Sequence, residues 1–266
     1  MEIHGFQKLT LLDYPEHIAA TVFTGGCNFR CPFCHNGDLV LNPQVAPLIP
    51  EEEVLAVLCK RRGMIQGVCI TGGEPTLQKD LREFIEKVKE LGFLVKLDTN
   101  GYRPRVLKSL LEEGLLDYVA MDVKAAPENY ALAAGLPGMD VSPILESVAL
   151  LKECKIPYEF RTTVVKGIHS VEEFDEIGRL LMGGRAYYLQ GFRESDGLLG
   201  GNFSGYTMDV YVEGRSIGEA EVAEEDTVRV ATQQRWKMTA FDREDMEKMA
   251  AIARKYIDKV ELRGVE

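Results

Sequence analysis

The sequence predicts an α/β protein with a parallel β-sheet, and three observations support this class. Six short runs rich in Val, Ile, Tyr, Phe and Thr alternate with amphipathic runs, as in βα units joined by right-handed crossovers. The β-rich runs carry few charges, which is typical of parallel strands that are covered on both faces. Glycines follow several helical runs directly. Both a doubly wound sheet and an incomplete barrel fit this pattern.

The expected elements follow the chain in βα order. Strands are predicted at 18–23, 66–70, 94–97, 118–122, 158–164 and 186–190. Helices are predicted at 51–62, 79–91, 103–113, 142–153 and 171–181, with a last helix at 242–256. Asp242 is the expected N-cap of that last helix. Gly92, Gly114 and Gly183 lie where a left-handed helix C-cap favours glycine.

Residues 200–237 interrupt this rhythm with a glycine-rich start and short alternating pieces, so we expect a β-rich insert there. The predicted organisation is therefore a main βα domain at 1–199, the insert at 200–237, and a terminal helix and tail at 238–266 that pack on the main domain.

Composition excludes some partners. The formal net charge of −11 disfavours binding to nucleic acid or to anionic membranes. No apolar run approaches the ~20 residues of a membrane span. The first residues lack a basic segment followed by an apolar stretch, so no signal peptide is expected. A cytoplasmic location, where thiols stay reduced, is the resulting expectation.

Three of the six cysteines lie within eight residues, with the spacing C-x3-C-x2-C in a loop flanked by glycine: Cys27, Cys31 and Cys34. In a reducing compartment this clustering indicates a metal centre. Three thiolates can ligate three irons of a cubane cluster and leave the fourth iron open. Zinc is the alternative, but a structural zinc site needs four ligands, and His35 next to Cys34 is poorly placed as the fourth.

Other polar motifs lie where predicted strands end. In Thr71-Gly72-Gly73-Glu74-Pro75, the glycines permit close approach of a ligand and Glu74 can accept from an ammonium, although a plain turn is the alternative. Asp98 and Asp122 follow neighbouring strands. They require a cation between them, unless they cap the following helices. Arg161, in an apolar strand, needs an anionic partner, either a ligand carboxylate or a structural ion pair.

The run Cys31-Pro32-Phe33-Cys34-His35-Asn36, with an aromatic residue just before the last cysteine, resembles the glycyl-radical-enzyme activases of the radical S-adenosylmethionine (SAM) superfamily. Among these the chain most resembles the activating proteins of anaerobic ribonucleoside-triphosphate reductases. The similarity extends over residues 12–15, 121–125, 159–165 and 187–190 and resumes in the last helix. It leaves out the insert.

The resemblance implies a laterally open, partial (β/α)6 barrel whose site lies at the carboxyl ends of the strands. It implies a [4Fe–4S] cluster on the three cysteines and SAM chelated at the open iron. One electron from an external flavodoxin or ferredoxin would then release a 5′-deoxyadenosyl radical. This radical would take a hydrogen atom from a glycine of a partner enzyme, an anaerobic ribonucleotide reductase or a similar protein.

The same resemblance implies the site residues. The implied SAM contacts are Phe33, Asn36, Gly72, Gly73, Glu74, Asp98, Lys124, Arg161 and Gln190. A monovalent cation is implied on Asp98, Thr99 and Asp122. Gln190 departs from the pattern of the pyruvate formate-lyase activases, which have a His-containing segment nearby.

Two other functions remain open at this stage. A radical SAM enzyme with a different protein or a small molecule as substrate is one of them, because the insert at 200–237 can reshape the open side. A non-enzymatic iron–sulfur module for electron transfer or sensing is the other. The remaining cysteines, Cys59, Cys69 and Cys154, are expected to be buried without a function. His4, His17 and His169 are expected at the surface or in loops.

Overall fold

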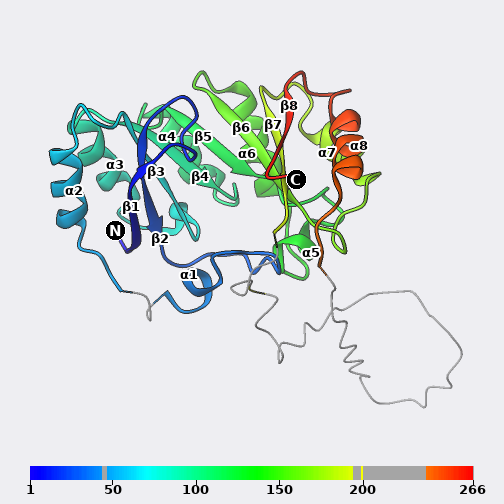
Figure 1. The fold of residues 1–266 in the computed structure, drawn as a ribbon, viewed down its shortest axis with the longest axis horizontal. Coiled ribbons are helices and arrows are strands. Elements are labelled where there is room, and N and C mark those ends of the chain that lie inside the picture. The colour runs from blue at the N-terminus through cyan, green and yellow to red at the C-terminus, as the bar shows by residue number, and fades with distance from the viewer. Residues whose placement is uncertain (44–46, 194–198, 200–237, 266) are drawn as a thin grey trace, which may run out of the picture.

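The computed structural model describes residues 1–43, 47–193, 199 and 238–265. Its centre is an eight-stranded sheet whose spatial order, β1 to β8, follows the sequence (Figure 1). The strands are β1 (Ile3–Thr10), β2 (Ala19–Thr24), β3 (Gly67–Gly72), β4 (Leu94–Thr99), β5 (Tyr118–Asp122), β6 (Tyr158–Val164), β7 (Tyr187–Gly191) and β8 (Val260–Arg263). Strands β2 to β8 are parallel, and β1 pairs with β2 in the antiparallel direction.

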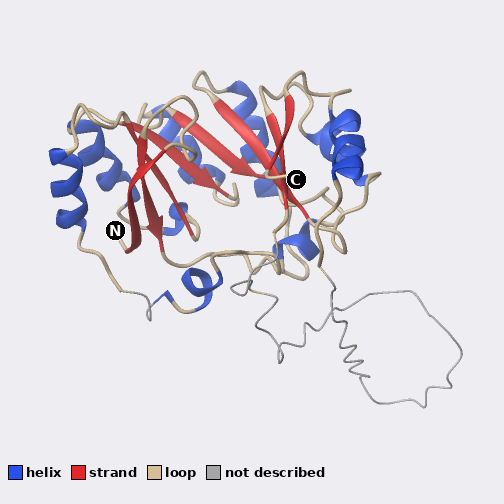
Figure 2. Ribbon diagram, viewed as in Figure 1, coloured by secondary structure: helices blue, strands red, loops and turns tan. Residues whose placement is uncertain are grey.

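The longer helices cover the outer face of this curved sheet, and two short helices lie beyond the carboxyl ends of its strands (Figure 2). The helices are α1 (Gly37–Leu41), α2 (Glu51–Lys60), α3 (Leu81–Glu90), α4 (Pro104–Glu112), α5 (Tyr130–Ala134), α6 (Ser142–Glu153), α7 (Glu173–Leu180) and α8 (Arg243–Ala253), with a 3₁₀ turn η2 (Pro75–Leu77). A doubly wound sheet reverses its strand order at a switch point. The order here is sequential, and β1 and β8 form the two ends of the sheet. The prediction of a laterally open partial barrel is therefore confirmed.

The two faces of the strands differ in chemistry. On β4, Val95 and Leu97 are completely buried in the apolar core, as are Phe84 and Ile85 of α3. Lys96 alternates with them and is therefore on the inner face. The sequence predicts that both faces of these strands are covered. The inner face carries polar side chains, among them Lys96 and Asp98 of β4 and Arg161 of β6, which are joined by ion pairs.

The sequence missed two strands. The edge strand β1 exposes three consecutive residues, so it lacks the alternation that predicts a strand. Strand β8 has only four residues, among them the charged Glu261 and Arg263. It pairs with β7 and brings the end of the chain into the sheet.

The predicted helix ends are largely confirmed. Gly92, Gly114 and Gly183 have φ values of 88°, 68° and 79°. Asp242 caps α8 by accepting from the Asp245 amide at 2.9 Å. The predicted β-rich insert at 200–237 lies outside the described residues, so the division into 1–199, 200–237 and 238–266 stays a prediction. Within the described residues, no helix is both long and apolar enough to cross a membrane.

Candidate active site

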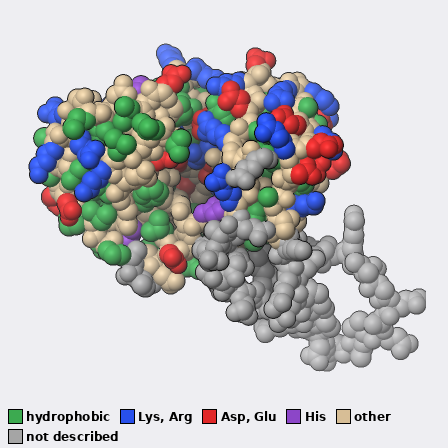
Figure 3. All heavy atoms as spheres, viewed as in Figure 1, with side chains coloured by type: hydrophobic (Ala, Val, Ile, Leu, Met, Phe, Trp, Pro, Cys, Tyr) green, Lys and Arg blue, Asp and Glu red, His purple; other side chains and the backbone are tan. Residues whose placement is uncertain are grey.

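A cavity of about 260 Å³ lies at the carboxyl ends of the parallel strands. Figure 3 shows a hollow in the middle of the molecule with basic and acidic side chains around it. Every residue that the sequence analysis assigned to a site lines this cavity: Cys27, Cys31, Phe33, Cys34, Asn36, Gly72, Gly73, Glu74, Asp98, Thr99, Asp122, Lys124, Arg161 and Gln190. Residues that the analysis did not assign join them: Phe29, His35, Val40, Thr71, Asn100 and Thr163.

The cysteine loop follows β2 and is fixed by backbone hydrogen bonds. The Gly26 amide donates to the Leu39 carbonyl of α1 at 2.8 Å, and the Arg30 amide donates to the Ala134 carbonyl of α5 at 2.8 Å. The Phe29 amide donates to the Cys27 sulfur at 3.3 Å. Two short helices that the sequence did not predict, α1 and α5, thus hold the loop at the cavity.

Burial raises the pKa of the Cys27 thiol to about 11 and that of Cys31 to about 12, and it also raises the pKa of Cys34. The positive charge of Lys124 opposes this rise at all three thiols. Metal binding must therefore displace thiol protons, as is usual for thiolate ligands. Three soft donors in a mostly buried cavity beside a fixed cation fit an iron–sulfur cluster.

The Gly72-Gly73-Glu74 turn is docked directly on the cysteine loop. The Gly73 amide donates to the Thr24 carbonyl, and the Glu74 amide donates to the Gly26 carbonyl, both at 2.8 Å. A Cβ atom on Gly73 would lie 1.9 Å from the Gly26 carbonyl oxygen. These glycines were predicted to permit the close approach of a ligand, but the first backbone that Gly73 approaches is that of the cysteine loop.

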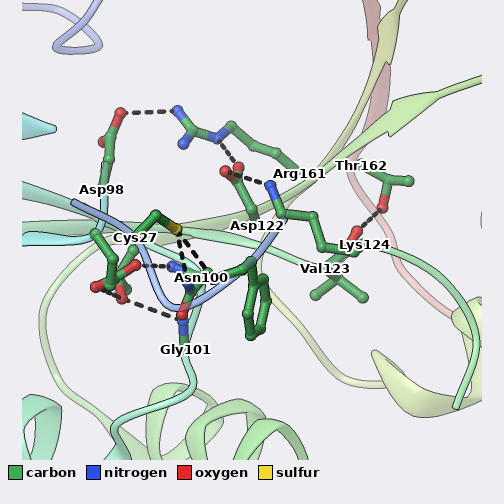
Figure 4. A network of polar contacts seen from close by, with 12 residues as sticks. Cys27, Asp98, Asn100, Gly101, Asp122, Val123, Lys124, Arg161 and Thr162 are labelled. Atoms are coloured by element: carbon green, nitrogen blue, oxygen red, sulfur yellow. Dashed lines mark hydrogen bonds and ion pairs between the residues drawn. The ribbon is translucent and has the colours of Figure 1, made fainter. Parts of the chain in front are cut away.

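The Glu74 carboxylate is buried and accepts several hydrogen bonds. Oε1 accepts from the Thr99 hydroxyl at 2.7 Å and from the Thr76 hydroxyl at 2.5 Å, and Oε2 accepts from the Asn100 amide at 2.7 Å. Burial raises the pKa of Glu74 despite these bonds. Asn100 also donates from its side chain towards the Cys27 sulfur at 3.8 Å (Figure 4). Asn100 therefore connects Glu74 with the cysteine loop. The signal in the sequence was its position directly after Asp98 and Thr99, which were assigned to the site.

Five charged side chains of alternating sign form what we call the charge row: Lys96, Asp98, Arg161, Asp122 and Lys124. Arg161 donates from Nε to Asp122 Oδ1 at 2.9 Å and from a terminal nitrogen to Asp98 Oδ2 at 3.2 Å (Figure 4). Lys124 Nζ donates to Asp122 Oδ2 at 3.1 Å, and Lys96 Nζ donates to Asp98 Oδ1. Of the two alternatives for Arg161, the structural ion pair is thus present.

The cations of the charge row lower the pKa of its two carboxylates. Burial alone would raise the pKa of Asp122, but Arg161 and Lys124 outweigh it and hold this pKa at about 2. The pKa of Asp98 is lowered for the same reason, by Arg161 and Lys96. The Thr99 hydroxyl is bonded to Glu74. The monovalent cation on Asp98, Thr99 and Asp122 therefore stays a prediction, although these residues already have partners within the protein.

Three further expectations can be compared with the structure. His169 lies in the loop between β6 and α7, as one of its two expected places, but it is not at the surface: it is only 6% exposed, and its ring centroid lies 6.3 Å from that of Phe33. Cys59 was expected to be buried, but it is exposed on α2, whereas Cys69 is buried as expected. Gln190 lies half-buried at the end of β7.

The open βα barrel, with a three-cysteine loop at the carboxyl ends of its strands, defines a class of barrel enzyme whose site is built from the loops after the strands. Residues 21–181 match the Radical SAM superfamily, and the chain belongs to this superfamily. The protein is therefore a radical SAM enzyme, and its cofactors are a [4Fe–4S] cluster and SAM. This membership supports neither the zinc alternative nor the non-enzymatic module.

Two relatives indicate different reactions. The chain is 34% identical over 198 residues to the "Putative glycyl-radical enzyme activating enzyme MJ1227" of Methanocaldococcus jannaschii. This alignment covers 73% of this chain and 81% of that protein. It is 33% identical over 157 residues to the "Probable GTP 3',8-cyclase" of Thermococcus kodakarensis, over 58% of this chain and 50% of that protein.

Solved structures share the fold. Streptococcus suis SuiB aligns over 92% of this chain and 48% of its own, with a TM-score of 0.59 and 13% identity. A structure of TYW1 aligns over 89% of this chain and 73% of its own, with a TM-score of 0.51 and 17% identity. At these identities the likeness concerns the fold alone.

Proposed function

We propose that the protein is a glycyl-radical-enzyme activase whose cluster is held by Cys27, Cys31 and Cys34. The observation that carries this proposal is the 34% identity to the archaeal relative named as an activating enzyme, since the alignment covers 81% of that protein. The substrate would be the Cα–H bond of one glycine in a partner enzyme, such as an anaerobic ribonucleotide reductase.

The residues around the cavity suit such a role. Asn36 fixes the end of the cysteine loop by donating from Nδ2 to the Gly72 carbonyl at 2.9 Å. Lys124 and Arg161 provide positive charge for the carboxylate of SAM, and the Gly72-Gly73-Glu74 turn provides the acceptors for its amino group. Phe33 and Gln190 would complete the contacts. When bound, the two cofactors supply the one-electron chemistry, and the protein orients them and excludes competing reactants.

The open sheet is also compatible with a protein substrate. A backbone Cα–H bond reaches the cavity only if a loop of the partner enters it. Because β1 and β8 end the sheet without pairing to each other, the barrel leaves a lateral opening. Only one cysteine cluster motif occurs in the chain, so we propose a cytoplasmic flavodoxin or ferredoxin as the electron donor.

A small-molecule reaction is the second candidate, because of the similarity to the GTP 3',8-cyclase. That alignment covers only half of the cyclase. Turnover of GTP without any partner protein would favour this candidate.

Electron paramagnetic resonance tests the proposal. The anaerobically reconstituted protein is reduced, supplied with SAM and mixed with an anaerobic ribonucleotide reductase. We expect a glycyl-radical signal on the reductase and release of 5′-deoxyadenosine. Cys31→Ser should abolish both, whereas Cys59→Ser, at an exposed position on α2, should retain them. Release of 5′-deoxyadenosine without a radical on any tested glycyl-radical enzyme would contradict the activase role.

A further inference from the structure

All four carboxylate oxygens of Asp98 and Asp122 accept hydrogen bonds from cationic side chains. Arg161 bridges the two residues by binding Asp122 Oδ1 at 2.9 Å and Asp98 Oδ2 at 3.2 Å. The outer oxygens bind Lys124, at 3.1 Å from Asp122 Oδ2, and Lys96, at Asp98 Oδ1. Both carboxylates are therefore neutralised by groups that belong to the fold.

Lys96 differs from the other two cations of the charge row. Its side chain is 1% exposed, against 13% for Arg161 and 16% for Lys124. Beyond Asp98, its ammonium contacts the Cys69 sulfur at 3.7 Å and lies 5.9 Å from the centre of the Tyr118 ring. An ammonium in such surroundings is retained only when it is paired with an anion. Lys96 thus places one unit of positive charge next to Asp98 from a position outside the cavity lining.

We propose that the Lys96 ammonium is a built-in monovalent cation for this site, so that the protein binds SAM without an inorganic cation on Asp98, Thr99 and Asp122. This inference rests on the proposed position of SAM in the cavity. The Thr99 hydroxyl supports it, because that hydroxyl donates to Glu74 at 2.7 Å.

The charges of the row favour the same conclusion. Its three cations exceed its two carboxylates by one unit. The surplus lies with Arg161 and Lys124, which line the cavity, whereas Lys96 does not belong to the cavity lining. One net positive charge suits the carboxylate of SAM. An added inorganic cation would instead meet a row that already carries one net positive charge and whose carboxylate oxygens are all paired.

Binding measurements in defined salts test this inference. SAM affinity of the anaerobically reconstituted full-length protein is measured by calorimetry at constant ionic strength, with choline, Na⁺, K⁺ or ammonium as the cation. We expect wild-type affinities within about twofold of one another. Lys96→Met should bind about tenfold more weakly in choline and should recover in K⁺, Na⁺ or ammonium. Lys87→Met, which removes an exposed lysine on α3, should behave like the wild type.

Three results would overturn the inference: a wild-type protein that needs K⁺ or Na⁺, a Lys96→Met protein with undiminished affinity in choline, or a loss that no cation restores. If Lys96→Met does not fold, the wild-type affinities in the four salts still show whether SAM binding requires an inorganic cation. Melting temperatures measured without SAM give a separate readout. Only Lys96→Met should melt at a higher temperature in Na⁺, K⁺ or ammonium than in choline. Failure of the wild type to bind SAM in every salt would contradict the proposed function instead.

Discussion

His169 holds the backbone of Lys124 through its imidazole. Nδ1 accepts from the Val165 amide at 3.0 Å, so Nε2 carries the proton and donates to the Lys124 carbonyl at 2.8 Å. The same ring packs edge-on near Phe33, the residue before Cys34. His169 therefore positions two parts of the cavity, although it is not itself part of the lining.

Replacement of His169 by alanine should destabilise the protein by about 1–3 kcal/mol, because it leaves the Lys124 carbonyl and the Val165 amide without their partner. SAM binding should also weaken as Lys124 shifts. Urea unfolding and calorimetry measure the two effects. His169→Asn, with a side-chain amide, should recover part of the affinity. Unchanged SAM affinity in His169→Ala would show that the contact serves stability alone.

Gly73→Ala should prevent normal docking of the cysteine loop, because its Cβ would lie 1.9 Å from the Gly26 carbonyl oxygen. We expect reconstituted protein with less than half of the wild-type iron content, measured by iron analysis and absorption spectra. Gly63→Ala is the matched control. Gly63 has a φ of 80° and open space around it, so its replacement costs about 1 kcal/mol through the backbone but should leave iron content unchanged. Equal iron content in the two variants would refute the docking role of Gly73.

Acid should weaken the fold through Asp122. The pKa of Asp122 is about 2 in the folded protein and about 3.9 in an unfolded chain. The folded state thus holds this proton more weakly. The stabilisation by the ionised group is present above about pH 4 and is lost as the pH falls towards 2.

Denaturant unfolding of the metal-free protein between pH 5 and pH 2.5 measures this effect. The wild type should lose more unfolding free energy over this range than Asp122→Asn. Asp38→Asn, which changes an exposed carboxylate on α1, should follow the wild type. Parallel curves for wild type and Asp122→Asn would contradict the expectation.

Arg263 ties the last strand to the barrel interior. Its guanidinium donates to both oxygens of Glu159, at 2.9 and 3.0 Å, and lies 3.3 Å from the centre of the Tyr188 ring. Glu159 is 1% exposed. Arg263→Ala removes both hydrogen bonds from the guanidinium to this buried carboxylate, which keeps the hydrogen bond that it accepts from the Tyr118 hydroxyl at 2.9 Å. We expect a loss of about 2 kcal/mol in urea unfolding.

Lys108→Ala provides the surface comparison, since it breaks an exposed 3.8 Å pair with Glu112 that is worth under about 0.5 kcal/mol. If Arg263→Ala costs no more than Lys108→Ala, β8 does not depend on this ion pair.

The sequence by itself determined the class of fold, the strand ends that carry polar motifs, and the cysteine loop. These features depend on local patterns: alternation of βα units, spacing of three cysteines, and glycines at turns. Because parallel strands end at one edge of the sheet, the polar motifs that follow them had to come together.

Only the tertiary structure decided how these groups are paired. Lys96 and Asp98 are two residues apart, but Arg161 and Asp122 come from other strands, so no local pattern reveals that Arg161 bridges two carboxylates. The same holds for His169, whose role depends on the Lys124 carbonyl 45 residues away. Strand β8 is four residues long and charged, and it becomes a strand because β7 offers it an unpaired edge. Pairings of this kind arise from packing between distant segments, and packing is the information that a single sequence does not display.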